Sequence, residues 1–279
     1  MKIMISGASG FLGSNLKRSL SKKYIVDTVS LTKDFESHIL NFAPDVFINC
    51  GWGGGSSFSD TQSFKQFDNL EIGKRLFKVL TKFENLTFVG FGSFSEYGDR
   101  SRIINENDIE KPTSLYGLNK KMFKDMSLYF CRAKNFSWLW LRPCYIYGPG
   151  DCQNRLITKA VEHCVSGKQL KLDSCQSVVD YLYIEDFNSA VDKLISYKTQ
   201  GVYNLCSGQQ YKVKDVVKKI EKLCNNNVVI FEPSEDRKSF PKYICGNNSK
   251  LQLATGWQPL ISLDEGLQKI IDGFKQKNG

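Results

Sequence analysis

Three glycines at fixed spacing constrain this chain more than any other feature of its sequence. They lie between Lys2–Ser6, which has the composition of a short buried strand, and Phe11–Leu20, which has the periodicity of an amphipathic helix. Gly7 permits a tight turn, Gly10 lets a pyrophosphate approach the backbone, and Gly13 lets the helix pack on the strand. The unpaired N–H groups at the helix start favour phosphate. The segment therefore predicts a dinucleotide site, and a plain tight turn is the alternative.

Strand-like and helix-like segments alternate through the first 150 residues. Strands are expected at Ile25–Ser30, Val46–Asn49, Leu86–Phe91 and Ser137–Leu141, and helices at Phe35–Phe42, Phe64–Phe83 and Tyr116–Lys134. Repeated strand–helix–strand units of this kind predict a doubly wound parallel sheet. We therefore expect residues 1–150 to form an α/β Rossmann domain that binds NAD(P).

The rhythm changes after Gly148-Pro149-Gly150. Helical patterns are then interleaved with short strands and separated by Gly and Asn turns. The helices are expected at Leu156–Val165, Val213–Leu223 and Leu263–Phe274, and the strands at Val202–Leu205 and Val228–Phe231. Residues 151–279 are predicted to form a smaller α/β lobe that binds substrate, with some segments returning to the core.

The formal net charge of +9 would suit a polyanionic partner. Because lysines and arginines are spread along the chain, a basic solvated surface is the simplest interpretation; a small phosphate-bearing substrate and nucleic acid are the alternatives. Apolar runs such as Val228–Phe231 fall far short of the roughly 20 residues that span a bilayer. The start of the chain lacks the apolar region of a signal peptide. We expect a cytoplasmic protein without a nucleic-acid or membrane partner.

Nine cysteines are scattered without a CxxC or zinc-type spacing, and only His38 and His163 accompany them. Such a pattern is typical of reduced thiols in a reducing compartment. No metal site is expected.

A tyrosine and a lysine four residues apart carry the catalytic prediction. Tyr116 and Lys120 share one face of the expected helix. A free tyrosine has a pKa of about 10, and a neighbouring ammonium lowers it by favouring the phenolate. Ser93 follows the strand Leu86–Phe91, so its hydroxyl is expected at the carboxyl edge of the sheet, where it can polarise a substrate carbonyl. The three side chains predict a hydride-transfer site.

The choice between NAD and NADP is expected at the end of the second strand. An acidic residue there would hold the ribose hydroxyls, whereas a cation accepts a 2′-phosphate. Ser30 takes the place expected for the acid, Asp27 lies too early, and Lys33 follows. Ser30 and Lys33, with Arg18 nearby, favour NADP over NAD; the alternative is an exposed lysine and loose specificity.

Five motifs together resemble the extended short-chain dehydrogenase/reductase family of NAD(P)-dependent nucleotide-sugar epimerases, dehydratases and reductases. They are Gly7–Gly13, Gly92–Gly98, Tyr116–Lys120, Leu141–Pro149 and Ser249–Leu267. The resemblance covers nearly the whole chain and implies that Ser93, Tyr116 and Lys120 are the catalytic triad. We also expect cofactor contacts from Ser9, Phe11, Leu12, Cys50, Gly51 and Pro143.

Departures from sister enzymes narrow the reaction. Dehydratases of this family have an Asp-Glu pair where this chain has Phe94 and Ser95, and Glu96 comes one residue late. The epimerase–reductases that make GDP-fucose have a Cys at the position of Ser95 and a His near Arg155. Neither dehydration nor C3/C5 epimerisation has its proton carriers here. The chemistry that remains is oxidation or reduction at one carbon.

The segment Gly51-Trp52-Gly53-Gly54 is similar to the Ala-Trp-Gly-Gly loop of 4-ketoreductases that make deoxysugars, and Gly92–Gly98 resembles their GTxxEYG. The resemblance implies NADPH-dependent reduction of a nucleotide-linked 4-keto-6-deoxyhexose, as in the synthesis of surface polysaccharides. An NAD-dependent 4-epimerase and a non-catalytic dinucleotide-binding scaffold are the alternatives. Trp52 is expected in the sugar pocket with Phe94 and Ser95; a core aromatic is its other interpretation.

The nucleotide half of the substrate is expected against the smaller lobe. Asn154 and Arg155 resemble a segment that holds the sugar nucleotide, and Arg237 matches an arginine that clamps the diphosphate, unless it is a plain surface cation. Val179 stands where relatives have another arginine, and Lys171 or Lys242 is the candidate replacement. A homodimer through the helices near 64–83 and 114–134 is usual in the family. The nucleotide base, the sugar and the stereochemistry at C4 are left open.

Overall fold

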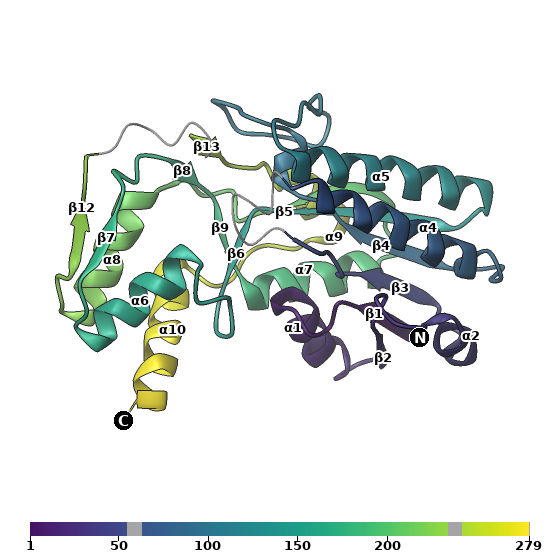
Figure 1. Cartoon of the computed structure of the whole chain (residues 1–279), viewed down its shortest axis with the longest axis horizontal. Coiled ribbons are helices and arrows are strands. Elements are labelled where there is room, and N and C mark those ends of the chain that lie inside the picture. The colour runs from purple at the N-terminus through teal and green to yellow at the C-terminus, as the bar shows by residue number, and fades with distance from the viewer. Residues whose placement is uncertain (55–62, 234–241, 279) are drawn as a thin grey trace.

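A computed structural model describes residues 1–54, 63–233 and 242–278 of the chain. Figure 1 shows an α/β core around a six-stranded sheet, with a smaller lobe beside it. All six strands run parallel. In spatial order they are β10 (Gly201–Leu205), β5 (Ser137–Pro143), β4 (Thr87–Phe91), β3 (Val46–Asn49), β1 (Lys2–Ser6) and β2 (Ile25–Val29). The predicted doubly wound parallel sheet is confirmed.

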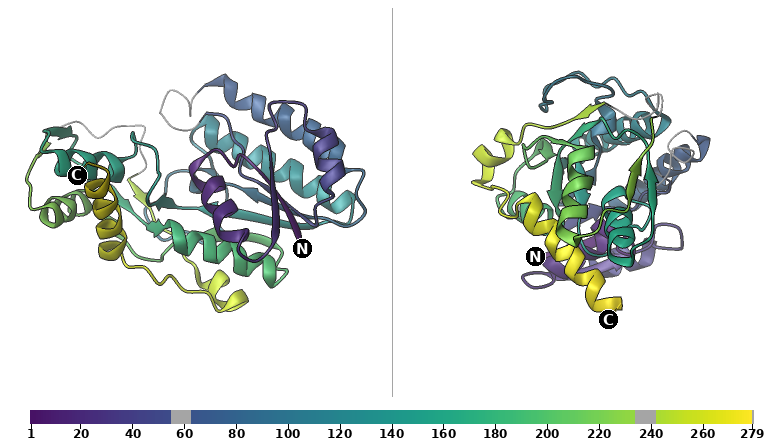
Figure 2. Two further views of the ribbon diagram at one scale, coloured as in Figure 1. Left: turned by 90° about the horizontal axis from the view of Figure 1, so that it is seen from below. Right: turned by 90° about the vertical axis from the view of Figure 1, so that its left-hand side faces the viewer.

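Helices cover both faces of this sheet, because successive side chains of a strand point to opposite faces. In β1, Ile3 and Ile5 enter one hydrophobic core and Met4 enters the other. The first face carries α1 (Phe11–Leu20) and α7 (Ile184–Ser196); the second carries α2 (Glu36–Phe42), α4 (Asp68–Leu80) and α5 (Leu115–Ala133). Figure 1 shows α4 and α5 on one side of the sheet and α1 and α7 on the other, and Figure 2 shows the same arrangement from two further directions.

The smaller lobe is built from the second half of the chain (Figure 1). Its helices are α6 (Leu156–Ser166), α8 (Val213–Cys224) and α10 (Leu263–Asn278). Its short strands pair as β7 (Leu170–Leu172) with β12 (Val229–Phe231), and as β11 (Tyr211–Lys212), β8 (Val178–Val179) and β13 (Tyr243–Ile244). Between the lobes, β6 (Tyr145–Tyr147) pairs with β9 (Tyr181–Tyr183).

Three segments of the second half return to the Rossmann core. The strand β10 pairs with β5, and α9 (Ser249–Thr255) packs against β10 and α7. The helix α7 has no counterpart among the predicted elements, because it begins directly after β9 without a glycine or proline to mark the boundary. Its buried residues make it part of the main core.

Local capping explains where observed boundaries differ from predicted ones. The Ser114 hydroxyl accepts the N–H of Gly117 at 3.0 Å, so α5 begins at Leu115, one residue before the expected start. The segment expected as one helix from Phe64 begins as a 3-10 turn, η1 (Phe64–Phe67), and α4 follows it.

Within the described ranges, no helix combines the length and the apolar character that crossing a membrane requires. In the same ranges, no three side chains of His, Cys, Asp or Glu gather closely enough to hold a metal ion.

Candidate active site

The turn after β1 is shaped by what its glycines lack. Gly7 has φ +69°, and a Cβ on it would lie 2.5 Å from the backbone nitrogen of Gly51. A Cβ on Gly13 would collide with the carbonyl oxygen of Gly7. Gly10 donates its N–H to that same carbonyl at 3.1 Å and caps α1 without a side chain. At the N-terminus of α1, these glycines therefore place no side chains over the backbone N–H groups of this turn.

The ends of β1 and β3 are joined side by side. The Ser6 hydroxyl donates to Oδ1 of Asn49 at 2.5 Å and accepts the N–H of Gly51 at 3.3 Å. Successive strands are added on opposite sides of β1, because β2 lies on one side of it and β3 on the other. Ligands of open α/β sheets bind at such a switch point. The start of α1, which has neither a side-chain cap nor an acidic residue in its first turn, fits a dinucleotide pyrophosphate.

The other residues predicted to contact the cofactor lie around this edge. Ser9 is exposed, whereas Phe11 and Leu12 are half-buried at the start of α1. Cys50 follows β3, and burial raises the pKa of its thiol to about 12, so it stays protonated. Pro143 ends β5 beside Leu205.

At the end of β2, Ser30 and Lys33 are exposed, and the Ser30 hydroxyl lies 3.0 Å from that of Thr32. Asp27 is occupied elsewhere: its carboxylate lies 2.8 Å from Nε2 of His38 and accepts the N–H of Thr28. The carboxylate of Asp27 therefore pairs with His38 of α2 and does not lie at the end of β2.

Lys120 is buried, with only 5% of its surface exposed. Its ammonium donates to the carbonyl oxygen of Phe91 at 2.8 Å and sits 3.7 Å from the centre of the Trp52 ring. It also lies 5.7 Å from the centre of the Tyr116 ring. Burial lowers the pKa of Lys120 to about 7, and the charge of Glu96 opposes that shift.

Tyr116 lies beside both Ser93 and Lys120. Burial raises the pKa of its phenol, and a hydrogen bond with the Ser93 side chain and the charge of Arg155 both act in the opposite direction. The Trp52 ring packs edge-on against the Tyr116 ring at 6.2 Å between centres. The phenol is thus a protonated group at neutral pH, hydrogen-bonded to Ser93 and close to Lys120.

Ser93 is the N-cap of a 3-10 turn, η2 (Phe94–Glu96). Its hydroxyl accepts the N–H of Ser95 at 3.1 Å and lies 3.2 Å from the Ser95 hydroxyl. Phe94 points away from these hydroxyls into a small core with Tyr97, and its exposed fraction is only 4%. The structure therefore brings Ser95, but not the ring of Phe94, next to Ser93.

The loop that carries Trp52 is held by two side chains absent from the sequence prediction. Oε1 of Gln66 accepts the indole N–H of Trp52 at 2.9 Å. Asn69 bonds both the N–H and the carbonyl of Gly53, at 2.7 and 3.0 Å. Both partners are buried, at η1 and the first turn of α4. Only their position after a glycine-rich loop signals this role in the sequence.

The residues predicted to bind the nucleotide are less completely placed. Asn154 and Arg155 are exposed at the start of α6, and the charge of Arg155 reaches Tyr116 and Tyr145. Arg237 lies outside the described residues. Val179 is buried, with 1% of its surface exposed. A buried valine cannot supply the phosphate contact that was expected of an arginine at this position.

The two lysines considered as replacements lie in different settings. Lys171 pairs with Glu232 at 2.8 Å across β7 and β12. Lys242 is exposed, and its carbonyl accepts the N–H of Val178 at 2.9 Å.

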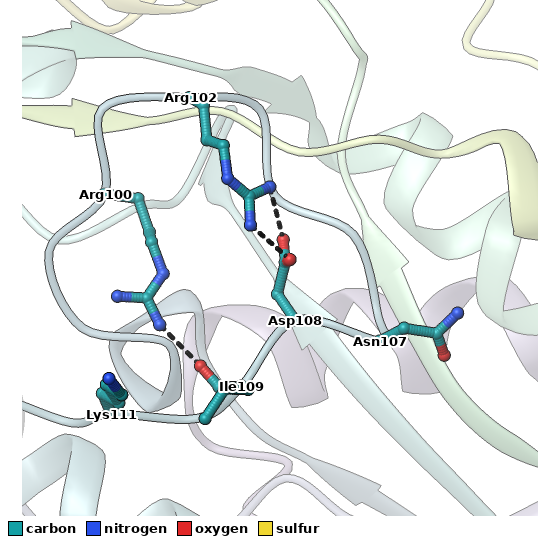
Figure 3. Close-up of a pocket in the computed structure, with 6 residues that line it drawn as sticks. All are labelled: Arg100, Arg102, Asn107, Asp108, Ile109 and Lys111. Atoms are coloured by element: carbon teal, nitrogen blue, oxygen red, sulfur yellow. Dashed lines mark hydrogen bonds and ion pairs between the residues drawn. The ribbon is translucent and has the colours of Figure 1, made fainter.

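A hollow in the loop before α5 is lined by basic side chains, but its two arginines are bonded within the loop itself (Figure 3). Arg102 forms a two-pronged pair with Asp108, at 2.5 and 3.0 Å. Arg100 donates to the carbonyl of Ile109 at 2.5 Å. Predicted site residues are absent from its lining, which is Arg100, Arg102, Asn107, Asp108, Ile109 and Lys111.

Known proteins share both the sequence pattern and the fold. The model of the NAD dependent epimerase/dehydratase family matches residues 3–206. The chain is 23% identical to GDP-6-deoxy-D-mannose reductase of Pseudomonas aeruginosa, over 99% of this chain and 98% of that protein. Its structure is similar to that of RMD from Pseudomonas aeruginosa complexed with NADPH, with a TM-score of 0.88, 21% identity and 99% of both chains covered. The UDP-glucose 4-epimerase of Thermus thermophilus in complex with NAD gives 0.90, at 18% identity and the same coverage.

Proposed function

The chain belongs to the NAD dependent epimerase/dehydratase family, and we propose that within it the protein reduces the 4-keto group of a nucleotide-linked 4-keto-6-deoxyhexose with NADPH. One observation carries the proposal. The phenol of Tyr116 is bonded to Ser93 and close to Lys120, whereas the two positions that hold acids in the dehydratases are Phe94, turned into the core, and Ser95. The site has a proton donor for a ketone oxygen but no acid–base pair for loss of water.

The residues present fit a nicotinamide dinucleotide, which when bound supplies the hydride for the carbonyl carbon. Gly7, Gly10 and Gly13 leave room at the start of α1 for the pyrophosphate. Ser30 and Lys33, exposed at the end of β2, suit the 2′-phosphate of NADPH. The alternative acid, Asp27, is engaged by His38.

The chain's own residues manage the proton. We expect the hydroxyls of Ser93 and Tyr116 to hydrogen-bond the ketone oxygen. Tyr116 then gives its proton to that oxygen, which becomes the alcohol, and solvent returns a proton to the phenolate. Burial raises the pKa of Tyr116, so the phenol carries its proton at neutral pH. The ammonium of Lys120 stabilises the phenolate that forms.

The nucleotide-diphosphate sugar is assigned to the smaller lobe. Arg155, whose charge acts on Tyr116, lies at the start of α6, where a diphosphate would meet a cation. Trp52 borders Tyr116 on the other side.

The proposed enzyme acts as a homodimer through α4 and α5. The exposed face of α5 carries large apolar side chains at Leu118, Met122 and Tyr129, with exposed fractions of 37, 40 and 73%. These residues recur at helical spacing and offer a partner helix an apolar stripe.

The proposal is tested by following NADPH absorbance with a panel of dTDP-, CDP- and GDP-linked 4-keto-6-deoxysugars. We expect one NADPH to be oxidised per sugar consumed with at least one of them. Tyr116→Phe should slow turnover by about 10²- to 10⁴-fold and leave NADPH binding nearly unchanged. Absence of NADPH oxidation across the panel would refute the reductase. Interconversion of sugars around copurified NAD would indicate the epimerase, and cofactor binding without any reaction would indicate a scaffold.

A further inference from the structure

The turn that carries Ser93 is closed from behind by a carboxylate that the reaction does not use. Oε1 of Glu96 accepts the backbone N–H of Ser93 at 2.9 Å, while the Ser93 hydroxyl accepts the N–H of Ser95 at 3.1 Å. These reciprocal bonds form a capping box over η2. The backbone of the predicted catalytic serine is thus fixed by Glu96.

Glu96 is completely buried, and its oxygens are engaged by the sheet. Trp140 donates its indole N–H at 3.1 Å and Arg142 donates its Nε–H at 2.8 Å, both from β5. A Cβ on Gly92 would collide with Oε1 of Glu96 and with the Trp140 indole nitrogen. With no exposed surface and three N–H donors, Glu96 cannot exchange protons with a substrate.

The counter-charge of Glu96 is shared. Arg142 also donates to Tyr97 at 2.6 Å and to Glu110, and Glu110 in turn binds Lys124. Burial raises the pKa of Glu96, and Arg142 opposes this shift. The guanidinium of Arg142 therefore favours the ionised form of the Glu96 carboxyl group against the effect of burial.

Lys120 reaches the end of the strand before this turn, where its ammonium donates to the Phe91 carbonyl at 2.8 Å, and its helix α5 packs against η2. The charge of Glu96 raises the pKa of Lys120 against the larger effect of burial. The other groups facing Lys120 are the Cys50 thiol after β3, which stays protonated, and the rings of Tyr116 and Trp52. The groups facing Glu96 are Arg142 and Tyr97, with Lys120, Tyr116 and Lys121 further along α5.

We propose that Glu96 is the positioning residue of this site: its buried carboxylate fixes the backbone of Ser93 and holds a negative charge behind the turn η2, against which α5 with Lys120 packs. The inference rests on the roles of Ser93 and Lys120 in the proposed function. Glu96 acts through those two residues and touches neither substrate nor cofactor.

The matched pair Glu96→Gln and Glu110→Gln tests this. Both variants remove one carboxylate from Arg142, yet only Glu96 bonds Ser93 and raises the pKa of Lys120. Lys120 is followed by NMR on protein with ¹³C-labelled lysines, its signal assigned from Lys120→Arg. We expect its titration midpoint to fall by about one pH unit in Glu96→Gln and to stay unchanged in Glu110→Gln. Equal midpoints in the two variants would overturn the proposal.

Catalysis gives a second readout. In Glu96→Gln the loss of kcat should be several-fold greater at pH 8 than at pH 6, because Lys120 then loses its proton earlier, while KM for NADPH changes little. A loss of kcat that is the same at both pH values would contradict the charge effect.

Glu96→Asp separates the two roles and serves if the glutamine variant does not fold. The shorter carboxylate keeps its charge but withdraws from the Ser93 N–H. The Lys120 midpoint should stay within a few tenths of a unit while kcat falls about tenfold; a midpoint lowered by a full unit, or an unchanged kcat, would overturn the proposal. The NMR titration needs no substrate, so it decides this inference even if no 4-keto sugar oxidises NADPH.

Discussion

Two turns at the carboxyl edge of the sheet, both led by glycine, are built on opposite principles. The turn after β1 holds its shape because side chains are missing at Gly7 and Gly13, and only backbone atoms meet there. The turn after β4 holds its shape because charges are present, with Glu96 beneath Ser93 and Arg142 beneath Glu96. The first suits a ligand that touches backbone, and the second suits side chains that must keep a fixed charge.

The largest expected effect comes from breaking the charged turn. Arg142→Met leaves the buried Glu96 and the half-buried Glu110 without their guanidinium, and loss of one partner of a buried pair costs about 3–5 kcal/mol of unfolding free energy. Urea denaturation measures this loss. Arg102→Met is the matched control, because it removes a largely exposed arginine from its pair with Asp108 and should barely move the urea midpoint. Equal losses in the two variants would contradict the distinction.

The turn after β1 should break by crowding instead. Gly13→Ala forces a methyl group into the Gly7 carbonyl and should lower the free energy of unfolding by about 1–3 kcal/mol. It should also weaken NADPH binding. In Gly10→Ala the nearest atom lies 3.4 Å from the new methyl. We expect that variant to keep its urea midpoint but to bind NADPH less tightly, as measured by fluorescence titration. If Gly10→Ala unfolds as easily as Gly13→Ala, the role assigned to Gly10 is wrong.

The difference between the turns also explains what the sequence could reveal. The first turn could be predicted because Gly7, Gly10 and Gly13 lie close together in the chain, and their spacing is typical of this turn. The second was not, because Glu96, Glu110 and Arg142 come from three separate segments and meet only in the folded core. Glutamate and arginine are usually exposed, so the sequence did not indicate that Glu96 and Arg142 are buried.

The same reasoning applies to the rest of the molecule. The parallel sheet followed from alternating strand and helix patterns, whereas α7 lacked a boundary signal and was missed. Phe94 followed Ser93 in the chain and was expected beside the sugar, but the 3-10 turn points its ring into the core with Tyr97. The role of Arg237 stays a prediction.

The smallest expected effect concerns the exposed end of β2, beyond the turn after β1. Lys33→Ala should weaken NADPH binding about fivefold, because one solvated ion pair with the 2′-phosphate is lost, and should leave NADH binding unchanged. Lys22→Ala, an exposed lysine beyond the other end of α1, is the control. Equal effects of Lys33→Ala on the two cofactors would remove the argument for NADPH.

The central claim is that the site transfers one hydride to the sugar while Tyr116 supplies the proton. Incubation with NADPH deuterated at its transferable position, followed by mass spectrometry and NMR of the sugar nucleotide, tests it most directly. We predict one deuterium at C4 of the sugar for every NADPH oxidised, and almost none with Tyr116→Phe. A converted sugar that carries no deuterium while NADPH is unchanged would contradict the account.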